Sequence, residues 1–89
     1  MSLRPVIQWT KSPESDVAGY RIYYRTASQS YDSTRRVDIP EPCPNWYRMT
    51  QLKNWEINFV QMTAYDTSNN ESNPSNEASV LVTGGLLMK

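Results

Sequence analysis

The chain has 89 residues, and its nine lysine and arginine residues are balanced by nine aspartate and glutamate residues. A chain of this length forms one domain at most, and the lack of a basic surplus argues against a nucleic-acid binder. Histidine is absent and there is one cysteine, Cys43, which excludes histidine-based catalytic triads, an internal disulfide and nearly every zinc site. No apolar run approaches the roughly 18 residues of a membrane span.

The predicted elements are short strands separated by polar loops. Residues 4–10 alternate weakly and predict a strand, and residues 11–18 predict a loop. Residues 19–26 predict the clearest strand, because one set of side chains alternates strictly with another; the two sets are Tyr20, Ile22 and Tyr24, and Arg21, Tyr23 and Arg25. Further strands are predicted at residues 35–39, 46–52, 57–65 and 75–82. No segment has a helical period, so the spacing of about 8–12 residues indicates a sandwich or barrel.

Residues 59–82, FVQMTAYDTSNNESNPSNEASVLV, carry the most informative pattern. They resemble the last hairpin of a bacterial fibronectin type III domain, which runs aromatic-x-apolar-x-Ala-x-Asp, loop, Glu-Ser, Ser-Asn-Glu. Trp9 resembles the core tryptophan of that family's strand B, Tyr20 begins a run that resembles strand C, and Leu52 resembles the leucine that precedes strand F. The resemblance implies an all-β, immunoglobulin-like β-sandwich of two antiparallel sheets, with the domain at residues 4–82 and a C-terminal tail at residues 83–89. It also implies that Trp9 belongs to the core.

Two positions depart from the family pattern. Asn58 stands where the family usually has the tyrosine of its tyrosine corner, so we expect either a substitute bond from the amide or a corner rebuilt with Trp55. The chain also starts almost at strand B, which implies that strand A is missing. An unpaired sheet edge invites pairing with another chain, so we expect residues 83–89 or a second copy to cover it, the latter giving a weak homodimer.

The resemblance places the strand containing residues 19–26 beside the one containing residues 57–65. Their solvent-facing side chains would then form an aromatic stripe flanked by arginine, a composition typical of interfaces. The candidate partner-binding residues are Arg21, Tyr23, Arg25, Phe59 and Tyr65, with Trp46 beside a loop. The alternative interpretation is that these residues are simply good sheet formers.

No catalytic, cofactor-binding or metal-ligating residues are predicted. Residues 66–71 have oxygen ligands at a calcium-loop-like spacing, but turns built by Asp and Asn explain them better. Glu14 and Asp16 lie in a solvated loop with nothing to desolvate them, and Cys43 lies in a proline-rich loop. We therefore expect no enzyme activity and no cofactor.

The functional prediction is a protein-interaction or spacer module from a larger bacterial protein that is exported or on the cell surface. An extracellular location follows from this prediction, with any export signal outside this chain. One alternative is a carbohydrate-binding accessory module of a polysaccharide-acting enzyme, and another is a small self-associating phage or assembly component. The expected partner is a protein or a polysaccharide, without nucleic-acid binding or membrane insertion.

Overall fold

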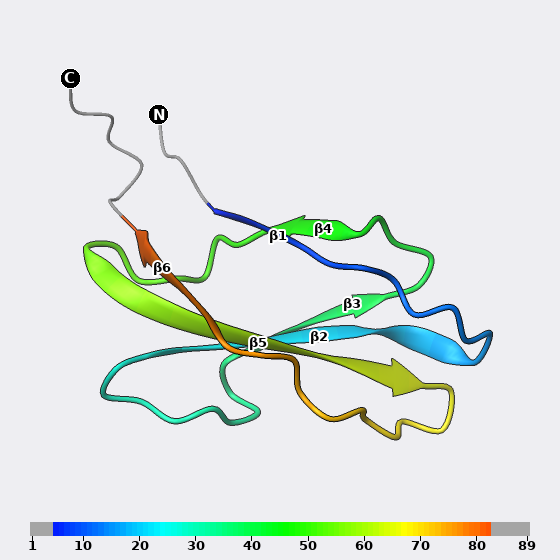
Figure 1. Cartoon of the computed structure of the whole chain (residues 1–89). Helices are drawn as coiled ribbons and strands as arrows, with labels where there is room; N and C mark the ends of the chain where they lie inside the picture. Colours follow the sequence, from blue (N-terminus) through cyan, green and yellow to red (C-terminus); the bar gives the residue numbers. More distant parts are fainter. Residues whose placement is uncertain (1–4, 83–89) are drawn as a thin grey trace.

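The computed structural model describes residues 5–82, which form six strands and no helix. The strands are β1 (Val6–Gln8), β2 (Val17–Thr26), β3 (Arg36–Pro40), β4 (Trp46–Arg48), β5 (Glu56–Asp66) and β6 (Ala78–Val82). β1 and β4 form a small antiparallel sheet over a larger antiparallel sheet in the order β3-β2-β5-β6 (Figure 1). The predicted all-β sandwich of two antiparallel sheets is confirmed.

The two longest strands, β2 and β5, form the centre of the larger sheet. Their register pairs Tyr24 with Val60 and Ile22 with Met62 on the inner face, and Arg25 with Phe59 on the outer face. Because successive side chains of a strand point to opposite faces, each strand supplies both the core and a polar surface.

The core lies between the sheets and is built from apolar side chains of every layer. Its buried members are Ile22, Ile39, Met49, Leu52, Val60 and Val82. β4 ends at Arg48, earlier than the predicted strand over residues 46–52, and Met49 and Leu52 after it are both buried. The chain therefore leaves the small sheet in order to fill the core.

The sandwich is open along the outer edge of β1. Among residues 5–82, β1 pairs only with β4, and a groove of 310 Å³ runs along Ile7, Trp9 and Met62. The prediction that Trp9 is core holds in part: its ring packs on the core and lies 5.5 Å from the Tyr20 ring, but the residue is half-buried. The expected cover from residues 83–89 lies outside the described residues, and pairing of this edge with a second copy stays a prediction.

Asn58, which stands where the resemblance implies a tyrosine, makes a set of amide hydrogen bonds. Its side chain is buried, accepts from the backbone N–H of Lys53 at 3.0 Å, and donates to the carbonyls of Lys53 and Glu56 at 2.9 and 3.0 Å. The corner is not rebuilt with Trp55, which is 65% exposed and adopts a left-handed φ of 64°. The Asn58 amide holds this turn together with the backbone N–H of Trp55, which donates to the carbonyl of Val82.

Residues 71–77 run beside β5 as an irregular segment. Two serines of this segment form hydrogen bonds to β5 in place of the regular bonds of a paired strand. Ser72 N–H donates to the carbonyl of Ala64 at 2.8 Å, and its hydroxyl accepts from the N–H of Ala64 at 2.9 Å. Ser75 forms the same pair of bonds with Met62, at 2.8 and 3.0 Å. These hydroxyls satisfy backbone donors that would otherwise lack partners at the sheet edge.

Candidate functional site on the outer face of the large sheet

The structure brings five of the six predicted site residues onto one surface, the outer face of the large sheet. Arg21, Tyr23 and Arg25 come from β2, and Phe59 and Tyr65 from β5. Trp46 does not join them, because β4 belongs to the other sheet, where Trp46 is 47% exposed.

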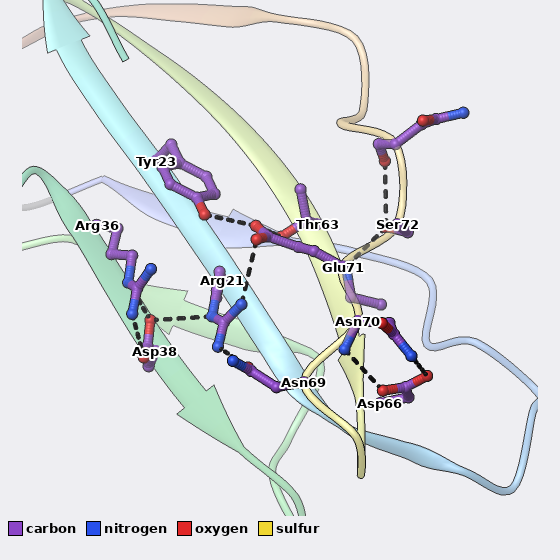
Figure 2. Close-up of polar contacts among 12 residues, drawn as sticks. Arg21, Tyr23, Arg36, Asp38, Thr63, Asp66, Asn69, Asn70, Glu71 and Ser72 are labelled. Atoms are coloured by element: carbon purple, nitrogen blue, oxygen red, sulfur yellow. Dashed lines mark hydrogen bonds and ion pairs between the residues drawn. The ribbon is translucent and has the colours of Figure 1, made fainter. Parts of the chain in front are cut away.

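Arg21 forms the first of two arginine clusters on this face. Its guanidinium carbon lies 4.2 Å from the centroid of the Tyr65 ring, and its Nη1 lies 3.2 Å from Glu71 Oε1. Nη2 donates to Asn69 Oδ1, and Nε lies 3.5 Å from Asp38 Oδ1, an ion pair without hydrogen-bond geometry (Figure 2). Arg21 thus joins β2, β3, β5 and the loop after β5, although it is only 7% exposed.

Arg25 forms the second cluster in the same manner. Its guanidinium carbon lies 4.5 Å from the centroid of Phe59 and 5.1 Å from that of Tyr31. Its Nη2 is 3.0 Å from Glu77 Oε2, which also accepts from the Tyr31 hydroxyl at 2.6 Å. Each arginine of β2 therefore stacks on an aromatic ring of β5 and pairs with a glutamate of the 71–77 segment.

These contacts correct the prediction of an exposed aromatic stripe. Tyr23, Phe59 and Tyr65 do lie on the outer face, but each is half-buried rather than exposed. The arginines cover Phe59 and Tyr65, and the hydroxyl of Tyr23 donates to Glu71 Oε2. Tyr65 is also packed against Gly19, where any side-chain carbon would collide with its ring and with the carbonyl of Ile39. Cation–π contact favours this layered arrangement over an open apolar stripe.

A hollow of 340 Å³, which we call the outer hollow, lies among residues of both clusters and of β5. Its principal lining residues are Tyr23, Tyr31, Gln61, Thr63, Glu71 and Pro74, with Asp32, Ser33 and Ser72 completing it. Tyr31 comes from the loop after β2, and Pro74 from the 71–77 segment. The volume is at the lower end of those that bind small molecules.

The charges around the outer hollow are balanced. Burial alone would raise the pKa of Glu71, but hydrogen bonds from Thr63 and Tyr23 and the charge of Arg21 outweigh it and lower that pKa. The pKa of Glu77 is likewise lowered, first by the Tyr31 hydrogen bond. Both carboxylates are therefore charged at neutral pH and each is paired with an arginine.

The remaining candidate sites show ordinary structural roles. Asp66 Oδ1 accepts from the N–H groups of Ser68 and Asn70, and Asn69 has a φ of 65°, which confirms the predicted turn. Cys43 is half-buried, and burial followed by the hydrogen bond to Glu41 raises the pKa of its thiol. Within residues 5–82, no group of three potential ligands could hold a metal ion.

Several residues of this face were not predicted from the sequence. Glu71, Glu77 and Tyr31 lie outside the strands, and the pairs Arg21–Glu71, Arg25–Glu77 and Tyr31–Glu77 are 46 to 52 residues apart in the chain. A glutamate in a loop is not part of an alternating pattern, so the sequence does not predict which face of the sheet its side chain will contact. The only feature of the sequence that could have predicted these pairs is the match between two acidic residues, one at each end of the 71–77 segment, and two arginines on one face of β2.

The chain was compared with family models, curated proteins and solved structures. No family model and no curated protein matches the sequence. Among solved structures, the chain is similar to part of the crystal structure of a β-1,2-glucanase from Parabacteroides distasonis, with a TM-score of 0.70 and 28% sequence identity. The match covers 88% of this chain and 10% of the glucanase chain, so this chain spans about a tenth of that enzyme's length. No helix of the described part is long and apolar enough to cross a membrane.

Proposed function

We propose that this chain is a fibronectin type III-like module without catalytic activity, which makes protein contacts or spaces other domains in a larger exported or surface protein. The observation that carries the proposal is that Arg21 pairs with Glu71 and Arg25 pairs with Glu77. These charged groups join strands and loops to one another, which is what a rigid module requires. A catalytic carboxylate pair would instead need one member with a raised pKa, whereas both glutamates have lowered ones.

The test is an activity screen of the purified chain against β-glucans, chromogenic glycosides and esters. We expect cooperative unfolding and no product. Turnover that survives repurification and is abolished by Glu71→Gln, but not by Glu14→Gln in the exposed loop before β2, would overturn the proposal.

A second candidate is an accessory module of a polysaccharide-acting enzyme. The specific observation in its favour is the similarity to a tenth of a β-1,2-glucanase, since a segment of that size in a large enzyme fits an appended or inserted module. Affinity electrophoresis through gels containing β-1,2-, β-1,3- or β-1,4-glucan tests this candidate. Retardation in one glucan gel relative to a gel without polysaccharide is expected, and equal mobility in all gels would contradict it.

A further inference from the structure

We propose that the outer hollow binds one sugar unit of a neutral polysaccharide. This inference rests on the second candidate function above and assigns it a site. The hollow lies between β2, β5, the loop after β2 and the 71–77 segment, so four parts of the chain define its shape. Its 340 Å³ volume and shallow form suit a single ring of a longer chain that continues over the surface.

The hydrogen-bonding groups of the hollow favour hydroxyl ligands. The side-chain amide of Gln61 has no hydrogen-bond partner among the described residues, and neither has the hydroxyl of Ser33. An amide offers two donors and an acceptor, and a serine hydroxyl both donates and accepts. Adjacent hydroxyls of a sugar also both donate and accept, so these two side chains suit them.

The walls of the hollow supply apolar surface for the ring itself. Tyr23 and Tyr31 are half-buried and Pro74 is exposed. Aromatic rings present a flat apolar face with partial negative charge, against which the C–H groups of a pyranose can pack. The two tyrosine hydroxyls are engaged with Glu71 and Glu77, which holds both rings in place before a ligand arrives.

Charge selects a neutral ligand over an anionic or cationic one. Arg21 pairs with Glu71, Arg25 with Glu77 and Arg35 with Asp32 at the rim. An anionic ligand would meet the carboxylates of Asp32 and Glu71, which line the hollow, and a cationic ligand would compete with the arginines that already pair with them. A neutral hexose chain leaves all three pairs intact.

The experiment is a titration followed by ¹H–¹⁵N NMR, with a β-1,2-linked glucose tetrasaccharide as the probe and its β-1,3- and β-1,4-linked counterparts beside it. We expect shifts confined to residues around Tyr23, Tyr31 and Gln61. Gln61→Ala and Tyr31→Ala should each weaken binding about tenfold. The matched controls Gln8→Ala and Trp46→Ala, on the other sheet, should bind as wild type does.

Three outcomes would overturn the site. These are the absence of shifts with all three neutral probes in the folded chain, shifts that cluster on the other sheet, and tighter binding of an anionic oligogalacturonide. If Tyr31→Ala loses stability, Gln61→Ala is the deciding variant, because the Gln61 side chain has no hydrogen-bond partner among the described residues. A chain that unfolds cooperatively, shows no turnover and binds no sugar contradicts this inference and leaves the non-catalytic module standing.

Discussion

Arg21 and Glu71 are separated by fifty residues in the chain, yet Nη1 of one lies 3.2 Å from Oε1 of the other. The arginine side chain is only 8% exposed and the glutamate side chain 30% exposed. The pair ties the loop after β5 to the middle of β2, on the face opposite the core.

Replacing Glu71 by glutamine should lower the free energy of unfolding. The amide keeps the shape of the side chain but leaves Arg21 with a single carboxylate partner, Asp38, at its Nε. We expect a loss of about 1–2 kcal/mol, since Glu71 is partly exposed and water screens part of the effect. Urea unfolding at pH 7 measures it, with Glu14→Gln as a control expected to stay within about 0.5 kcal/mol of wild type. Equal stability of the two variants would show that the ion pair contributes nothing.

Stability should fall in acid because the folded state lowers the pKa of Glu71 and Glu77. A carboxyl with a depressed folded pKa stabilises the fold above its unfolded pKa, near 4.5, and this stabilisation is lost as the pH falls through the folded value. Urea midpoints measured from pH 7 to pH 2 should therefore decline below about pH 4.5. The decline should be shallower in the Glu71→Gln, Glu77→Gln double variant, and an identical pH profile would contradict the assignment.

Tyr31 should titrate late in alkali. Burial, followed by the hydrogen bond to Glu77, raises its pKa to about 12 from an ordinary value of 10.0. A group with a raised folded pKa contributes stability that is present below its unfolded pKa and lost as the pH rises through the folded one, here between 10.0 and about 12. ¹³Cζ NMR resolves this tyrosine from the others. Glu77→Gln should bring the pKa of Tyr31 back towards the ordinary value. Glu56→Gln, at an exposed position of β5, should leave it unchanged.

Replacing Asn58 by alanine should destabilise the fold by about 2–3 kcal/mol, because three hydrogen bonds to the turn before β5 are lost together. Thermal and urea unfolding measure the effect. Asn76→Ala is the matched control, since Asn76 is exposed. A loss no larger than that of Asn76→Ala would mean that water replaces the amide at the turn without cost.

Trp55→Gly should stabilise the domain by about 1 kcal/mol. An L-residue in the left-handed region is strained by roughly this amount and glycine is not, and Trp55 has a φ of 64° with 65% of its surface exposed. Trp55→Ala removes the same ring but keeps the strain, so it should show no gain. If both variants gain equally, the ring is the cause and the backbone is not.

Sequence patterns predicted the sheets better than the surface above them. β2 and β5 were predicted because strict alternation indicates which side chains point inward. Any strand with one buried face must alternate in this way, whatever packs against it. The exposure of Tyr23 was predicted wrongly because alternation says nothing about Glu71, which reaches it from a loop. The left-handed Trp55 was also unpredictable, since tryptophan is not a residue that favours this conformation.

The paired bonds of Ser72 and Ser75 to β5 divide the 71–77 segment into anchors and freely variable positions. The two serines lie three residues apart, and each gives β5 one backbone N–H donor and one hydroxyl acceptor, at Ala64 and Met62. Asn73, Pro74 and Asn76 are exposed between and beside these anchors, so a randomised library at these three positions should retain the fold in most of its members. The segment is thus a natural place to diversify recognition in an engineered form of this domain, provided that both serines are kept.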